Sequence, residues 1–178
     1  GSLDFGINQK TQRELVTEIV ATIAFSSLTN NDKVGLILFS DIVELYVPPK
    51  KGRKHVLHII RELLNFVPQH KSTDVNVALE LLMRTQRKRS IGFVLSDFLD
   101  ASDFVTNLSM AAKKHDIVAV KVYDQFMSDL PNVGLMKVED AETKQVAYLD
   151  TSSKSVRENH RKWWLQVDAN LDADFRKS

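Results

Sequence analysis

The sequence predicts an α/β fold, a doubly wound and mostly parallel sheet with helices on both faces. Short continuous apolar runs alternate along the chain with segments whose apolar residues recur at helical spacing. The runs at Val34–Phe39, 91–95 and 117–122 are typical of strands covered on both faces. With 178 residues, 43% of them hydrophobic, we expect one domain spanning residues 1–178.

The remaining elements follow from periodicity and from helix and strand breakers. Helical spacing of apolar residues predicts helices at 8–28, from the "KKGRKH" stretch to Pro68, and at 75–85, 104–114 and 153–177. Residues 42–47, which end at two prolines, suit an edge strand that pairs with Val34–Phe39 through a tight turn. Residues 134–138 and 146–149 flank "EDAETKQ" and predict a small hairpin.

The last predicted helix carries two adjacent tryptophans. Its apolar residues near one face are expected to be Val156, Trp163, Val167, Leu171 and Phe175. Trp163 and Trp164 cannot point the same way on a helix, so we expect one in the core and the other on a contact surface.

Composition excludes several classes of function. The formal net charge is +1, from 24 basic and 23 acidic residues, and gives no argument for general nucleic-acid binding. The chain has no cysteine, which excludes disulfides, thiolate zinc sites and a cysteine nucleophile. No apolar run approaches the roughly 20 residues of a membrane span, and the N-terminus lacks a signal-peptide pattern. We therefore expect a cytoplasmic protein.

Polar residues at the predicted sheet edge point to a cation site. Asp97 follows the apolar run 91–95, and the carboxyl ends of parallel strands are where open α/β sheets bind ligands. Thr73 precedes a predicted helix in "KSTDV", and "GSLDFG", which contains Ser2, precedes the first helix. Hydroxyls and a carboxylate, without cysteine or paired histidines, suit a hard divalent cation such as Mg²⁺.

Each of these residues also has a structural interpretation. Thr73 or Ser72 is equally suited to be the N-cap of the following helix, and Asp74 suits its first turn through the helix dipole. Asp97 is able to cap its own turn. Ser2 has the alternative interpretation of a cloning remnant.

Two weaker candidates lie on the helix after "KKGRKH". His55, His58 and Glu62 share one helical face and form a potential transition-metal site, although such coincidences are common on exposed faces. The basic residues at its start suit a phosphate or an acidic partner, but also a solvated face; they are Lys50, Lys51, Arg53 and Lys54.

Nothing in the sequence provides a complete catalytic apparatus. Walker A, Gly-x-Ser-x-Gly and His-Glu-x-x-His motifs do not occur. The enzymatic alternative is a magnesium-dependent phosphoryl-transfer or hydrolytic enzyme that uses Asp97. Because no general base or nucleophile partner is evident for Asp97, we expect a protein that is not an enzyme.

Seven stretches carry a resemblance over nearly the whole chain. They are "GSLDFG", "NDKVGLILFSD", "VPPKKGRKHVL", "STDVNVALELL", "SDFLD", "KKHDIVAVKVYD" and "LPNVGLMKVEDAETKQ". In order and spacing they resemble the bacterial von Willebrand factor A-like proteins of domain-of-unknown-function family fifty-eight. The resemblance implies an interaction or assembly module, with a MoxR-type AAA+ ATPase as the expected partner and no established reaction.

The resemblance also implies a metal-ion-dependent adhesion site. Ser2 matches the last serine of the family's Asp-x-Ser-x-Ser motif, Thr73 its threonine and Asp97 its later aspartate. The family's pattern places a strand with the first aspartate before Gly1, and a further strand and helix after the last predicted helix. The resemblance therefore implies a domain shortened at both ends that binds Mg²⁺ weakly or not at all. Without that first strand we also expect possible self-association through unpaired strand edges.

Overall fold

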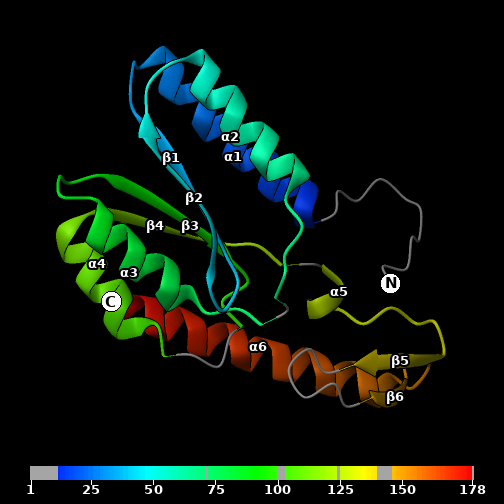
Figure 1. Cartoon of the computed structure of the whole chain (residues 1–178). Coiled ribbons are helices and arrows are strands. Elements are labelled where there is room, and N and C mark those ends of the chain that lie inside the picture. The colour runs from blue at the N-terminus through cyan, green and yellow to red at the C-terminus, as the bar shows by residue number, and fades with distance from the viewer. Residues whose placement is uncertain (1–11, 71, 100–102, 124, 140–145, 178) are drawn as a thin grey trace. The chain divides into compact units, whose positions relative to one another are not determined.

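The computed structural model in Figure 1 describes residues 12–70, 72–99, 103–123, 125–139 and 146–177. The chain has a mixed α/β fold, as predicted. The helices are α1 Gln12–Thr29, α2 Arg53–Asn65, α3 Val75–Thr85, α4 Val105–Lys114, α5 Gln125–Ser128 and α6 Lys154–Lys177. The strands are β1 Val34–Phe39, β2 Val43–Lys50, β3 Ile91–Ser96, β4 Asp116–Lys121, β5 Leu135–Glu139 and β6 Val146–Asp150.

The described strands form three separate two-stranded sheets. β1 pairs with β2, β3 pairs with β4 in parallel, and β5 pairs with β6 in antiparallel fashion. The predicted pairing of residues 42–47 with Val34–Phe39 and the predicted β5–β6 hairpin are confirmed. The parallel β3–β4 pair agrees with the expected mostly parallel sheet. One continuous, doubly wound sheet stays a prediction, because the described strands do not join into one.

The chain divides into two compact units. Among the described residues, the first contains 12–36 and 46–67, and the second contains 37–45 and those that follow position 67.

In the first unit, α1 packs on α2. The Arg13 guanidinium, on α1, donates to the carbonyl oxygens of Leu64 at 3.0 Å and Phe66 at 2.7 Å, and so ties the start of α1 to the end of α2. The apolar stripe of α2 is buried at Val56, Ile59 and Leu63, as its helical spacing predicts.

Gly35 in β1 allows a close approach of the two strands in this unit. A Cβ atom at this position would lie 2.8 Å from the carbonyl oxygen of Val47, closer than real Cβ contacts permit. A residue without a side chain is therefore required here for β1 and β2 to pair as they do.

The core of the second unit is one cluster of buried side chains, contributed by α3, β3, α4, α6 and the turns next to them. Its members are Val75, Leu79, Val94, Phe98, Phe104, Leu108, Ala111 and Leu171. The cluster lies on the face of β3 that carries Val94, where α3 and α4 run beside the β3–β4 pair (Figure 1). Packing of helices on one face of a parallel pair is the layered arrangement typical of α/β proteins.

The opposite face of the β3–β4 pair is partly exposed, so the prediction that these strands are buried on both faces is wrong. Ile91 is 66% exposed, Phe93 42% and Val118 43%. Successive side chains of a strand alternate between the two faces of a sheet, so these residues lie opposite Val94. A continuous apolar run shows that both faces are apolar, but it does not show that both are covered. The predicted self-association through unpaired strand edges stays a prediction.

One of the two adjacent tryptophans of α6 is buried and the other is exposed, as predicted, but the buried one is not the one expected. Trp164 is 4% exposed and Trp163 is 55% exposed. The predicted position of Trp163 on the apolar face is wrong, because the ring of Trp164 instead packs against the ring of Tyr123, with centroids 5.3 Å apart.

The short helix α5 was not predicted, because its four residues are too few for a periodicity to be recognised. Among the described residues, none of the helices combines the length and the apolar character needed to cross a membrane.

Candidate functional site

The candidate site lies where α3 begins and β3 ends, in the second unit. Val75 follows Thr73 and Asp74, and Phe98 follows Asp97; both Val75 and Phe98 belong to the same buried cluster. Packing thus brings the start of α3 and the end of β3 to one core, as the predicted site requires. Ser2, the third predicted ligand, lies outside the described residues.

Asp97 caps its own turn. Its Oδ1 accepts a hydrogen bond from the amide of Leu99 at 3.2 Å, and the Oγ of Ser96 accepts one from the amide of Phe98 at 3.1 Å. The structural interpretation of Asp97 is therefore confirmed. Its second oxygen, Oδ2, accepts no hydrogen bond from the described residues, and the half-buried carboxylate keeps one oxygen for a ligand.

The N-cap of α3 is Asp74. Its side chain accepts a hydrogen bond from the amide of Asn76 at 2.9 Å, and its backbone is extended, as is usual for an N-cap. The prediction that Thr73 or Ser72 caps this helix is wrong, because the carboxylate of Asp74 takes that position. Thr73 is exposed, and capping does not use its hydroxyl.

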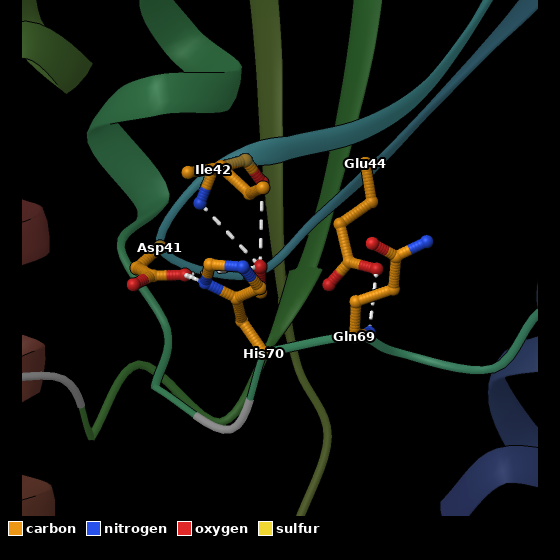
Figure 2. Close-up of polar contacts among 6 residues, drawn as sticks. Asp41, Ile42, Glu44, Gln69 and His70 are labelled. Atoms are coloured by element: carbon orange, nitrogen blue, oxygen red, sulfur yellow. Dashed lines mark hydrogen bonds and ion pairs between the residues drawn. The ribbon is translucent and has the colours of Figure 1, made fainter.

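The segment that carries Thr73 is attached to the turn between β1 and β2 (Figure 2). The amide of Gln69 donates to the Oε2 of Glu44 at 2.8 Å, and the Nδ1 of His70 lies 2.7 Å from the Oδ1 of Asp41. Beyond Thr73, the amide of Asp74 donates to the carbonyl oxygen of Ser40 at 3.0 Å. The described residues on both sides of Thr73 are therefore held by contacts with this turn and with β2.

Asp41, in this turn, and Glu44, in β2, both have carboxylates with a lowered pKa. Burial alone would raise the pKa of Asp41, but the electrostatic interaction with His70 and hydrogen bonds from His70, Ser40 and Ser72 outweigh it, and the pKa lies below its ordinary value. The hydrogen bond from the Gln69 amide lowers the pKa of Glu44 most, with burial opposing it. Both groups are therefore negatively charged acceptors at neutral pH.

The polar cluster of Asp41, Glu44, Gln69 and His70 was not among the sites predicted from the sequence. A signal was present, because Ser40 and Asp41 directly follow the run Val34–Phe39, just as Ser96 and Asp97 follow 91–95. The rule that drew attention to Asp97 therefore applies to Asp41. Its contact with His70 was not predictable, because it depends on how distant segments pack.

The histidine candidates on α2 do not assemble into a metal site. The Nε2 of His55 lies 2.8 Å from the carbonyl oxygen of Val34, while the Nδ1 of His58 lies 3.3 Å from the Oε1 of Glu62. In the part of the chain that the structure describes, no group of three or more His, Cys, Asp or Glu side chains could hold a metal ion. The basic residues at the start of α2 are all exposed, as on a solvated face; they are Lys50, Lys51, Arg53 and Lys54.

Two solved structures share this fold. An aerotolerance-related membrane protein from Bacteroides fragilis NCTC 9343, with multiple mutations to serines, superposes with a TM-score of 0.60 at 16% identity, covering 86% of this chain and 78% of that one. The conserved hypothetical protein BatB from Bacteroides thetaiotaomicron superposes with a TM-score of 0.54 at 17% identity, covering 86% and 77%. At these identities the likeness concerns the fold alone.

Relatives by sequence are uncharacterized mycobacterial proteins. Proteins of Mycobacterium bovis and Mycobacterium tuberculosis are 29% identical over 144 residues, which is 80% of this chain. The chain spans 45% of the length of these relatives. The model of the family described as "Protein of unknown function DUF58" matches residues 1–168. The chain therefore belongs to the DUF58 family.

Proposed function

We propose that this chain is a protein-interaction module of the von Willebrand factor A type, with a doubly wound sheet and a metal-ion-dependent adhesion site. The observation that carries the proposal is the placement of Thr73 and Asp97 beside one buried cluster, through Val75 and Phe98. Membership in the DUF58 family and the likeness in fold to BatB support it. On the basis of the resemblance to von Willebrand factor A-like proteins, we propose a MoxR-type AAA+ ATPase as the partner.

The available donors fit Mg²⁺, but only as part of a site. Thr73 offers an exposed hydroxyl and Asp97 a carboxylate with one oxygen outside its own turn. Both are hard oxygen donors, which Mg²⁺ prefers, and Mg²⁺ usually keeps several waters beside them. With a single carboxylate in this set, binding of Mg²⁺ to the chain alone is expected to be weak. A carboxylate from the partner would add both charge and a ligand, so the metal would strengthen the contact between the two proteins.

Binding to a MoxR-type AAA+ ATPase of the same organism tests the proposal. We expect immobilised chain to capture the purified ATPase in Mg²⁺ and to release it in EDTA, as measured by biolayer interferometry. Asp97→Ala is expected to weaken capture by about tenfold or more, because it removes a charged ligand. Asp32→Ala serves as the control, since Asp32 is an exposed acid in the loop that follows α1. Capture that is indifferent to both EDTA and Asp97→Ala would refute the metal-dependent contact.

The enzymatic alternative makes a different prediction. The Leu99 amide occupies one oxygen of Asp97, and the described ion pair of Asp41 with His70 is solvent-accessible. We expect no turnover in a screen of phosphomonoesters and carboxylic esters with Mg²⁺ or Mn²⁺. A turnover that Asp97→Asn abolishes, while Asp32→Asn leaves it intact, would establish the hydrolytic enzyme in place of the interaction module.

A further inference from the structure

Phe98, the residue after Asp97, has a backbone conformation that is rare for a bulky side chain. Its φ angle is 55°, in the left-handed region. The side chain is buried, with 4% of its surface exposed. A residue other than glycine keeps such a conformation only where the surrounding structure holds it there.

Two aromatic rings from the ends of helices hold the ring of Phe98. Phe175, in the last turns of α6, meets it edge-on, with ring centroids 5.0 Å apart at 88°. Phe104, the residue before α4, lies 5.5 Å away at 51°, and the rings of Phe104 and Phe175 are 6.0 Å apart. Edge-to-face and tilted pairs at these distances are favourable arrangements of aromatic rings. The three rings therefore form one aromatic cluster that holds the side chain of Phe98.

The conformation of Phe98 decides where the carboxylate of Asp97 points. The hydrogen bond from the Leu99 amide to the Oδ1 of Asp97 closes a turn that has Phe98 at its centre. A change of φ at Phe98 to an ordinary negative value would rotate the following peptide and carry the Leu99 amide away from Asp97. The carboxylate would then lose the donor that fixes its orientation.

We propose that Phe98 is a positioning residue for Asp97, and that the end of α6 sets the orientation of the Asp97 carboxylate through Phe175. Contacts that displace the end of α6 would release Phe98 from the left-handed conformation and free the carboxylate. The part that concerns what Asp97 binds rests on the proposed function. The link between Phe175, Phe98 and Asp97 does not.

Amide hydrogen exchange of the whole chain, measured by NMR, tests the link without metal or partner. We expect Phe175→Ala to accelerate exchange of the Leu99 amide by about tenfold, the factor that corresponds to the cost of a left-handed residue. The control is Leu165→Ala, because Leu165 lies on the same helix and is 59% exposed. The amide of Leu79, in the middle of α3, reports global stability. An unchanged Leu99 amide, or equal acceleration at Leu99 and Leu79, would overturn the proposal.

A second pair of variants separates the backbone conformation from the packing of the ring. Phe98→Gly and Phe98→Ala both remove the ring, but only glycine adopts a φ of 55° without strain. The Leu99 amide is therefore expected to exchange more slowly in Phe98→Gly than in Phe98→Ala. Equal exchange in the two variants would overturn the proposal. The expected exchange pattern in a chain that captures no ATPase would support the positioning role and refute only the proposed function.

Discussion

Replacement of Trp164 by alanine is expected to lower the free energy of unfolding by about 3–5 kcal/mol, the usual cost of truncating a buried aromatic side chain. Trp164 is 4% exposed, and its ring packs against the ring of Tyr123. The Nζ of Lys121 lies 5.4 Å from the centroid of the Trp164 ring and pairs with Asp168 of the same helix. The substitution therefore removes apolar packing and a cation–π contact together.

The neighbouring Trp163 provides a matched control for this prediction. It is the same residue type on the same helix, but it is 55% exposed. Trp163→Ala is expected to change the free energy of unfolding by no more than about 0.5 kcal/mol, as for most surface substitutions. Urea denaturation followed by far-UV circular dichroism measures both variants. Similar losses in the two variants would contradict the assignment of Trp164 to the core.

Stability is expected to decrease as the pH falls below 6.5, because His115 is buried in its neutral form. His115 is 1% exposed, and neither of its ring nitrogens has a hydrogen-bond partner among the described residues. Burial lowers its pKa most, the positive charges of Lys114 and Arg89 lower it further, and Asp116 opposes them. The folded-state pKa thus lies below the ordinary value of 6.5. As the pH falls, the unfolded chain takes up the proton first, and stability is lost between the ordinary pKa and the lower folded-state pKa.

Two substitutions at His115 separate the effect of its titration from the effect of burying ring nitrogens that have no partner among the described residues. His115→Leu is expected to raise the free energy of unfolding by about 1–3 kcal/mol at neutral pH, because it removes buried polar atoms that lack partners. His115→Gln keeps buried polar atoms, so it should bring no such gain. Both variants should lose the part of the pH dependence that His115 causes. Urea denaturation at about pH 7.5 and pH 5 measures this, and an unchanged difference between the two pH values in both variants would contradict the prediction.

Most elements of the fold were predictable from the sequence, because the signals for helices and strands are local. β1 and α3 have the predicted bounds, Val34–Phe39 and Val75–Thr85. A short apolar run and a 3.6-residue periodicity are both visible within about ten residues. The pairing of the strands into one sheet was not visible in this way, since register and neighbours depend on segments far apart in the chain.

The candidate site was predictable in part. Asp97 and Thr73 were identified because polar residues after an apolar run, or before a helix, mark the edge of an α/β sheet. Local backbone geometry decided that Asp74, and not Thr73, caps α3. The sequence left this undecided, because several consecutive polar residues are all suited to be the N-cap. The contact between Asp41 and His70 was not predictable, because no local pattern links them.

The sequence by itself determined the α/β class, most helices and strands, and the presence of acids and hydroxyls at the ends of strands. Only the tertiary structure decided which of two adjacent tryptophans is buried and that Phe98 takes a left-handed conformation. It also decided that the ring nitrogens of His115 find no hydrogen-bond partner among the described residues. The physical reason is the range of the interactions. Backbone hydrogen bonding and periodicity act between near neighbours, whereas burial and strain depend on side chains contributed by distant segments.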